Sequence, residues 1–538
     1  DKLKKNFPKS KSYLDNAILQ QGISFSLKRN FSQAINTLES LLEEYPNSKF
    51  RNETKYWLGY SKSFKAELTR KKNKKDSINE YKDSIRYFNN VNTKFLTQNQ
   101  KNRRWYLIGQ AWWTIGDISN AANAWSRYLK EADYSDPKKS LQIKFQLASK
   151  FQSNKNFSES EKWYAKIVNE HKNSNLSKES SFWRAEMAYA SALKKYKSIP
   201  KKTASLIVKY YNSYLEKDDE KHKALTFYRL GTLQQNILPL KSIAAFKNYL
   251  ETKDKIFSIE VQYRLAHLYI NTKQPKNAIN VFKKYLRGGD KTYSKEVTYH
   301  LGYLYIDTKQ PQKAIKTFEK YLENGNKDSI PEIQIRLGYL YIDTKKPQKA
   351  IKIFEKYLEN GNKDSIPEIQ IRLGYLYIDT KKPQKAIETF EKYLSSNNKD
   401  YEAEVLIRLG YLYIENNQIN EAINIFEKYL AGETKDHFLE IKMRLAYLYV
   451  ETKQFFLAIA LFEQVLQNPE YRQNKNILKT LSVLYRENLS EEKYINFLIE
   501  VRGDQKLEEK FRREFQTQLI FAYYQQNNCE NLILELSD

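Results

Sequence analysis

The sequence predicts an all-α protein, a solenoid of about 13 stacked helix hairpins, and three observations support this fold class. Small residues that follow a Leu recur at spacings of 35 once and 36 thereafter: Gly231, Ala266, Gly302, Gly338, Gly374, Gly410, Ala446 and Ser482. Residues 318–351 are identical to residues 354–387, which lie one 36-residue period further along the chain. Apolar residues within each period follow the spacing of helices. We therefore expect an elongated array without strands.

Each period contains two apolar patterns of helical spacing that are joined by a polar turn. In one unit the two patterns and the turn are Ile335, Leu337, Leu340 and Tyr341, then the turn 343–347, then Ala350, Ile351, Phe354, Tyr357 and Leu358. Gly338 and Ala350 are expected to let the two backbones approach closely, while Phe354 and Tyr341 fill the space between units. The unit is thus predicted to be a helix hairpin.

The N-terminal part of the chain, residues 1–217, is predicted to be an irregular array. All seven Trp lie at or before Trp183, and the glycine spacing changes from 37 to 50 between Gly22, Gly59 and Gly109. The longer interval contains the charged insertion 70–75, which is expected to extend a helix or a loop. The pattern is stretched again over residues 198–223.

The rest of the chain is predicted to be regular. Residues 218–502 keep the 36-residue period, and residues 503–538 form a partial, capping repeat. The boundary near residue 218 separates the two textures.

The repeated motif resembles the tetratricopeptide repeat. The residues that carry the resemblance are Leu301-Gly302-x-x-Tyr305 with Ala314-x-x-x-Phe318, the equivalent Leu337, Gly338, Tyr341, Ala350 and Phe354, and Trp105-x-x-Ile108-Gly109-x-x-Trp112 with Ala121-x-x-x-Trp125. The resemblance implies a right-handed superhelix in which the first helix of each hairpin lines a concave groove. It also implies core positions for Trp105, Trp112 and Trp125. Tyr321 and Tyr357 depart from the family, which usually has a small residue there.

Composition excludes several classes of protein. The chain has 538 residues, of which 41% are hydrophobic and 14% aromatic, so it can bury a large core. No stretch of about 18 uncharged apolar residues is present, so no membrane span is expected. The first residue is Asp1, which leaves open a removed signal peptide or a trimmed chain. Cys529 is the only cysteine, which excludes an internal disulfide and a cysteine-based metal cluster.

The formal net charge of +27 suggests an anionic partner, but the predicted groove is mixed in sign. By the resemblance, its exposed stripe is Glu332, Arg336, Tyr339 and Asp343, and it recurs in the next three units. Lysines fall instead on the second helices and turns. A groove with carboxylates beside its cations does not favour a nucleic acid backbone.

The candidate partner-binding residues are Trp57, Trp113, Arg336, Tyr339, Arg372, Tyr375, Arg408, Tyr411, Arg444 and Tyr447. Trp57 and Trp113 are expected on the open face of their helices, where they either anchor a partner or pack locally. The pair Glu332 and Arg336 either serves a groove or stabilises its own helix.

Other chemistry is not indicated. His267 and His300 lack a third ligand, so no metal site is expected, and Cys529 has no histidine to activate it. Phosphate loops, nucleophile elbows and supported acid pairs are missing from the sequence, so no catalytic residues, no cofactor and no enzymatic activity are expected.

We therefore expect a protein-interaction scaffold whose near-identical repeats act as a spacer. Its resemblance to envelope tetratricopeptide proteins, carried partly by residues 45–48, favours a periplasmic or cell-envelope assembly such as a flagellar motor, with the cytoplasm as the alternative location. The second hypothesis is that a basic convex face binds an anionic polymer or an anionic membrane surface. The sequence names neither a partner nor an oligomeric state.

Overall fold

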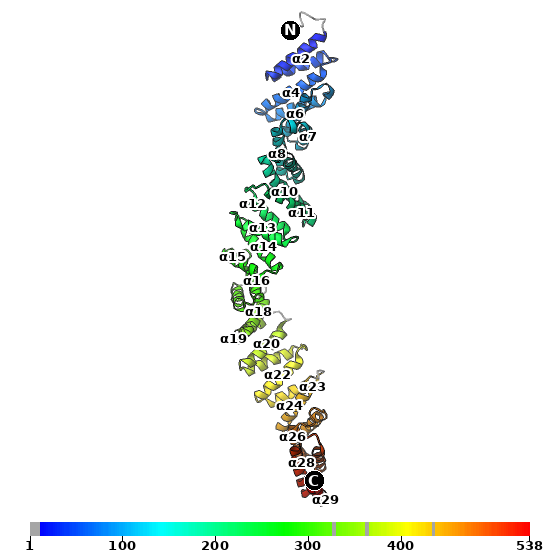
Figure 1. Ribbon diagram of the computed structural model, residues 1–538, viewed down its shortest axis with the longest axis vertical. Helices are drawn as coiled ribbons and strands as arrows, with labels where there is room; N and C mark the ends of the chain where they lie inside the picture. The colour runs from blue at the N-terminus through cyan, green and yellow to red at the C-terminus, as the bar shows by residue number, and fades with distance from the viewer. Residues whose placement is uncertain (1–10, 325–329, 361–364, 397, 433–435, 538) are drawn as a thin grey trace. The chain divides into compact units, whose positions relative to one another are not determined.

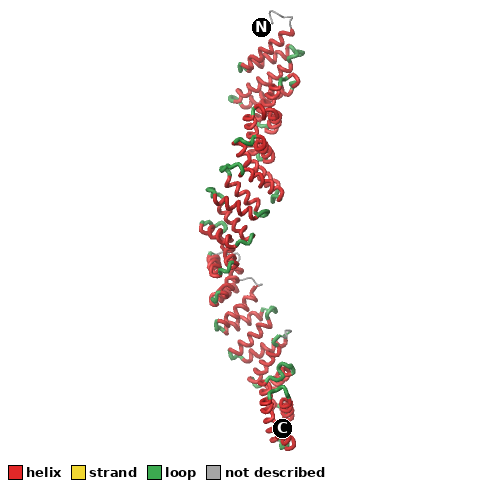
Figure 2. The backbone as a smooth tube through the Cα atoms, in the orientation of Figure 1, coloured by secondary structure: helices red, strands yellow, loops and turns green. Residues whose placement is uncertain are grey.

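The computed structural model describes residues 11–324, 330–360, 365–396, 398–432 and 436–537. Regular structure in these ranges is entirely helical, with 28 α-helices and one short 3-10 helix (Figure 2). The predicted all-α fold is confirmed. Successive helices taken in pairs give 14 hairpins, close to the predicted number.

The chain divides into two compact units, Asp1–Asp290 and Lys291–Asp538. The first unit contains α2 (Lys11–Leu27), α3 (Phe31–Glu44), α4 (Arg51–Arg70), α5 (Lys74–Asn89), η1 (Thr93–Phe95), α6 (Gln98–Ile115), α7 (Ile118–Ser135), α8 (Pro137–Ser153), α9 (Phe157–Glu170), α10 (Asn175–Lys195), α11 (Lys201–Leu215), α12 (Lys223–Gln234), α13 (Pro239–Glu251), α14 (Ser258–Asn271) and α15 (Pro275–Arg287). The sequence boundary near residue 218 falls inside this unit, between α11 and α12.

The second unit contains α16 (Ser294–Asp307), α17 (Pro311–Glu323), α18 (Ile330–Asp343), α19 (Pro347–Asn360), α20 (Ile366–Asp379), α21 (Pro383–Ser395), α22 (Glu402–Glu415), α23 (Ile419–Ala431), α24 (Phe438–Glu451), α25 (Phe455–Leu466), α26 (Lys475–Asn488), α27 (Glu491–Gly503), α28 (Glu509–Gln525) and α29 (Cys529–Ser537). Within each unit, helices that are neighbours in sequence pack against one another (Figure 1). Even-numbered helices are the first helices of the hairpins, and odd-numbered helices are the second.

A phenylalanine ring packs onto the small residue of each regular hairpin. A Cβ atom added to Gly338 would lie 2.2 Å from Cε1 of Phe354, and the ring of Phe390 stands in the same relation to Gly374. Phe354 is fully buried. The glycine thus makes room for the aromatic ring of the second helix of the same hairpin, whereas the sequence predicts that Phe354 fills the space between units.

The turns inside six successive hairpins, from α14/α15 to α24/α25, each contain a residue in the left-handed conformation. In one unit Lys345 has a φ of 56°, and the backbone N–H of Lys346 donates to the carbonyl oxygen of Tyr341 over 2.8 Å. The same conformation recurs at Lys273, Lys309, Lys345, Lys381, Asn417 and Lys453. This closure satisfies carbonyl groups at the end of the first helix, and it places basic side chains at the hairpin turns, as the sequence predicts.

The tyrosines that replace the family's small residue are buried parts of the core. Tyr249 and Tyr393 are fully buried, and the hydroxyl of each accepts a hydrogen bond from the backbone N–H eight residues later, at Phe257 (2.8 Å) and Tyr401 (3.0 Å). This bond ties the connection between one hairpin and the next to the second helix. Tyr357 is fully buried as well, while the connection that follows it includes residues outside the described ranges.

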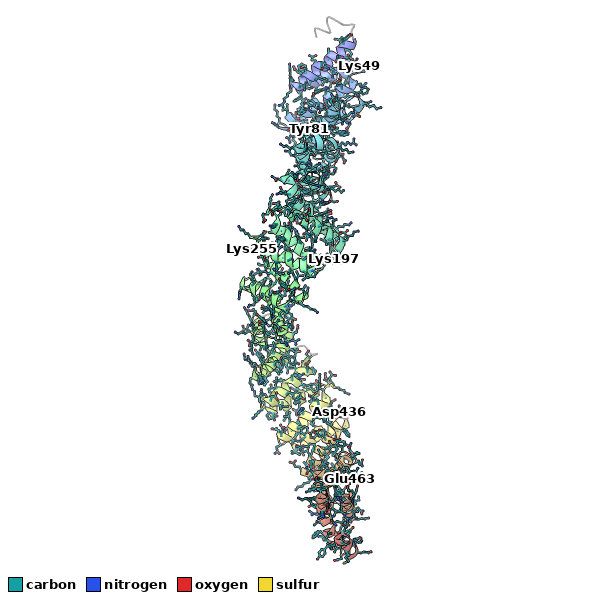
Figure 3. The ribbon with its side chains drawn as sticks, in the orientation of Figure 1. Lys49, Tyr81, Lys197, Lys255, Asp436 and Glu463 are labelled. Atoms are coloured by element: carbon teal, nitrogen blue, oxygen red, sulfur yellow. The ribbon has the colours of Figure 1, made fainter. Side chains whose placement is uncertain are left out.

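The charged insertion lengthens a hairpin in the first unit, as predicted. Helix α4 has 20 residues, against 14 in α16, and the exposed residues 70–75 comprise the end of α4, the turn and the start of α5. The extended hairpin is held by Tyr81, labelled in Figure 3, whose hydroxyl donates to Glu67 over 2.7 Å. Its basic tip therefore extends from an ordered pair of helices.

His222 lies in an aromatic environment in the first unit. Its ring stacks on Phe182 with centroids 3.9 Å apart, and Trp183 contacts it edge-on. Its Nε2 atom is buried without a hydrogen-bond partner among the described residues. Burial, assisted by the charge of Lys221, lowers the pKa of His222. The folded protein thus favours the neutral imidazole.

Because the unfolded chain takes up this proton at a higher pH than the folded chain, we expect stability to be lost as the pH falls below about 6.5. The H222F variant should show a weaker decrease. Urea unfolding of the full chain, followed by tryptophan fluorescence, measures this for the first unit, since all seven Trp lie there. The exposed His437 supplies the control variant, H437F, which should behave like the wild type. An unchanged pH slope in H222F would contradict the assignment.

The Phe354 contact predicts a coupled pair of substitutions. G338A should lower the free energy of unfolding by about 1–3 kcal/mol, because a methyl group overlaps the ring, although better helix propensity offsets about 1 kcal/mol of that loss. F354L should cost less in the G338A background than in the wild type, because the smaller side chain relieves the overlap. Urea unfolding monitored by circular dichroism tests this coupling, and strictly additive effects would be evidence against it.

Candidate functional site

A ladder of polar side chains connects the first helices of the regular array. The hydroxyl of Tyr339 on α18 donates to Glu368 on α20, and the hydroxyl of Tyr411 on α22 donates to Glu440 on α24 over 3.1 Å. The same bond joins Tyr303 to Glu332 and Tyr375 to Glu404. We call this series the groove ladder.

The ring of each tyrosine in the groove ladder is also contacted by the guanidinium of an arginine from the following hairpin. The guanidinium carbon of Arg372 lies 5.9 Å from the ring centre of Tyr339, and that of Arg408 lies 5.8 Å from the ring of Tyr375. Burial, and then the hydrogen bond to Glu368, raise the pKa of Tyr339. The tyrosine therefore remains a neutral donor to the carboxylate, and the stripe holds neighbouring hairpins together.

Glu332 and Arg336, for which the sequence left open a role in the groove or in their own helix, both contact a third residue. Both side chains reach to Tyr303 on the preceding first helix, where the carboxylate accepts the hydroxyl and the guanidinium lies 5.7 Å from the ring centre. The sequence signal for this contact is the constant separation of 29 residues between each tyrosine and its glutamate.

A second ladder lies between each second helix and the next first helix. Tyr341 donates to Glu319 and Tyr377 donates to Glu355, each over 2.6 Å. Equivalent bonds join Tyr413 to Glu391, Tyr449 to Glu427, and Tyr485 to Glu463, which is labelled in Figure 3. Lys349 lies 3.4 Å from Glu319, so a cation neutralises the carboxylate. The sequence interpretation missed this ladder, whose signal is the constant separation of 22 residues.

The predicted groove residues occupy equivalent places in successive hairpins. The arginines Arg336, Arg372, Arg408 and Arg444 are exposed, and the tyrosines Tyr339, Tyr375, Tyr411 and Tyr447 are half-buried. Asn476 stands where the next glutamate of the series would be, 29 residues after Tyr447. A groove of about 900 Å³ lies beside the stripe at α22 and α24. Binding of a partner by these residues stays a prediction.

Models of the tetratricopeptide repeat match residues 16–48, 259–287, 296–324, 331–360, 367–400 and 403–431. The chain is a tetratricopeptide-repeat protein. No curated protein sequence matches it. The repeat is in general a fold for interaction between proteins.

Several solved structures are similar to parts of the chain. MamA is 21% identical over 32% of this chain and 91% of its own, with a TM-score of 0.27. YrrB, described as a protein of the same repeat with an unusual peptide-binding site, is 17% identical over 39% and 97%, with a TM-score of 0.28. The C-terminal part of a repeat-containing protein from Cytophaga hutchinsonii is 20% identical over 47% and 96%, with a TM-score of 0.31. At these identities and scores, no partner or activity is inferred from them.

The two candidate tryptophans of this tetratricopeptide-repeat protein are half-buried rather than fully open. Trp57 contacts the ring of Tyr60 at 5.2 Å, and its Nε1 atom is buried without an acceptor among the described residues. The ring of Trp113 lies 5.5 Å from that of Trp125, whose Nε1 donates to a backbone carbonyl. Local packing thus accounts for much of each ring, and partner anchoring by Trp57 and Trp113 stays a prediction.

The remaining candidate groups do not form a site in the part of the chain that the structure describes. No cluster of three His, Cys, Asp or Glu side chains suited to a metal occurs there. Burial lowers the pKa of His300. Cys529 is exposed at the start of α29. Among the described helices, none is long and apolar enough to cross a bilayer.

The groove ladder predicts a measurable coupling between neighbouring repeats. Y339F and E368Q should each lower stability, and the double variant should cost less than the sum by about 0.5–1 kcal/mol, because both single variants break the same hydrogen bond. Urea unfolding of the full chain and the three variants measures the coupling. The pair Tyr339 and Glu404, which do not share a bond, gives the control cycle Y339F with E404Q. Equal coupling in both cycles would contradict a specific Tyr339–Glu368 interaction.

Proposed function

We propose that the protein is a non-enzymatic scaffold that holds other proteins at a set separation within a larger assembly. The observation that carries the proposal is the repetition of the same contacts at successive hairpin interfaces of the regular array. Tyr339 to Glu368 and Tyr375 to Glu404 are equivalent bonds, one period apart. An array built in this way gains length with each added copy, while every junction keeps its complementary surface.

In this proposal the two parts of the array have different tasks. Identical repeats offer identical surfaces, so they cannot each recognise a different feature of an asymmetric partner. The N-terminal residues 1–217 are diverse, and they contain Trp57, Trp113 and the charged insertion 70–75. We assign specific recognition of partners to this part, and we assign to the regular part the task of setting the distance between them.

We further propose a bacterial periplasmic or cell-envelope assembly, such as a flagellar motor, as the setting. The support is the resemblance of residues 45–48 to envelope proteins with this repeat, together with a composition rich in Lys, Asn, Ile and Tyr. Fractionation of the native cells tests the location. Recovery of the protein with the cytoplasmic fraction would overturn the envelope setting and leave the scaffold proposal in place.

Excision of residues 318–353, one full period, should leave a folded protein with a shorter array. The new junction places Phe354 against Gly302 and Glu368 within reach of Tyr303, which reproduces contacts that already exist. Helicity per residue should be unchanged in circular dichroism, and the radius of gyration in X-ray scattering should fall. Partners of either end should still bind, but their assembly with the scaffold should be misplaced or weakened.

Excision of residues 354–389 is the matched control, because it removes another full period and should have the same effects. Excision of residues 318–337 removes part of a period, so it breaks the register and should destabilise the second unit. If a full-period excision abolished binding by a partner of one end, the regular repeats would be a recognition surface and the spacer assignment would be wrong. Co-precipitation from native extract with the full chain supplies the partners for this comparison.

A further inference from the structure

The step between α4 and α6 reverses the charge pattern of the groove ladder. Counted from the glycine of each first helix, Tyr60 and Arg103 occupy the positions that Tyr339 and Glu368 occupy in the regular array. Nη2 of Arg103 donates to the hydroxyl of Tyr60 over 3.2 Å, and the guanidinium carbon lies 4.9 Å from the ring centre. A cation thus stands where the ladder has a carboxylate.

The next first helix supplies a second cation, which lies over a tyrosine outside the ladder positions, since Tyr106 precedes Gly109 by three residues whereas Tyr339 directly follows Gly338. Helices α6 and α8 contain no acidic residue, whereas each first helix from α14 to α24 carries a glutamate in its first turn. Nζ of Lys139 on α8 lies 3.8 Å from the ring centre of Tyr106 on α6. Neither Arg103 nor Lys139 forms an ion pair with a carboxylate among the side chains that the structure describes. Asp136 is nearby, and it accepts a hydrogen bond from the backbone N–H of Lys139.

Aromatic rings replace carboxylates as the supports of these cations. The exposed Arg103 and the half-buried Lys139 are each placed over a tyrosine of the preceding first helix. A cation held on an aromatic face keeps most of its hydrogen-bond donors free, because the ring accepts no conventional hydrogen bond. Arg103 uses one donor on Tyr60 and retains the others of its planar fork.

The charged region is short. Glu53 lies on α4 and Glu179 lies on α10, where it pairs with Lys221 at 3.0 Å. Among the described first helices, α12 also lacks an acidic residue, but α6 and α8 are the only two successive ones that do. A long polyanion requires a longer unpaired track, and stacking of bases requires free ring faces, whereas the faces of Tyr60 and Tyr106 already carry cations.

We propose that Tyr60, Arg103, Tyr106 and Lys139 form a cationic surface that binds an acidic segment of a partner protein. A carboxylate from the partner pairs with the donors of Arg103 that the contact with Tyr60 leaves free. A guanidinium matches a carboxylate with two parallel N–H donors, and its support on Tyr60 fixes the fork before binding. This inference rests on the proposed scaffold function and names the chemistry of one partner.

The test uses the full chain and a short fluorescein-labelled peptide of alternating Glu and Gly, with a matched peptide of alternating Gln and Gly. Fluorescence anisotropy should show tighter binding of the Glu peptide, and its affinity should fall as salt is added. R103E should weaken binding of the Glu peptide by about tenfold or more, since it restores the carboxylate of the ladder. K139Q should weaken it by a smaller factor.

Two variants keep the result interpretable. R103E should remain folded, because the hydroxyl of Tyr60 can donate to the new carboxylate as Tyr339 does to Glu368, and circular dichroism checks this. R372Q removes an exposed arginine from the regular groove ladder and should bind the Glu peptide as the wild type does. Equal binding of the Glu and Gln peptides by the wild type would overturn the proposal, and so would unchanged affinity in folded R103E or an equal loss in R372Q.

Heparin and single-stranded oligothymidine identify the other class of ligand. If either binds tightly, depends on Arg103 and displaces the Glu peptide completely, the surface is a site for polyanions and the assignment to a protein segment is wrong. If heparin and oligothymidine bind only weakly, and R103E does not change that binding, the assignment to an acidic protein segment is supported. The scaffold proposal is tested separately by full-period excision, which leaves α4 to α8 intact, so failure of one proposal does not decide the other.

Discussion

The packing of a phenylalanine ring on the small residue of the first helix is the contact on which the rest of the regular array depends. Phe354 on Gly338 and Phe390 on Gly374 allow the two helices of a hairpin to approach only to the thickness of the ring. A hairpin of this size cannot bury its apolar face alone, so it is stable only against a neighbour. The ring lies between the two helices of a hairpin. Neighbouring hairpins then pack through the apolar faces that these helices present to one another.

That regular spacing brings polar groups of neighbouring repeats within hydrogen-bond distance. The hydroxyl of Tyr339 reaches Glu368, and the hydroxyl of Tyr377 reaches Glu355, and both kinds of contact occur at each of the four interfaces between the hairpin α16/α17 and the hairpin α24/α25. Arginines and lysines at these contacts offset the carboxylates. Cations and carboxylates thus lie side by side along the groove ladder, whereas at the step between α4 and α6 Arg103 stands in the position of the carboxylate.

The groove ladder of the regular array and the step between α4 and α6 have different functional consequences. A surface that repeats contact for contact adds length without adding a new recognition element, which suits the part of a scaffold that sets distance. A surface with a unique charge arrangement can distinguish one partner from another. The structure thus gives the irregular N-terminal repeats and the regular repeats separate physical properties, even though both are built from the same helix hairpin.

The sequence by itself determined the all-α class, the period, the hairpin unit and the repeat family, because apolar residues that are buried periodically recur at the same spacing along the chain. It also located the charged insertion 70–75. Only the tertiary structure decided which side chains meet. Contacts between Tyr339 and Glu368, the burial of Trp57 and the substitution of Arg103 into the ladder depend on distances between different hairpins, and those distances are set by packed side-chain volumes that no local pattern specifies.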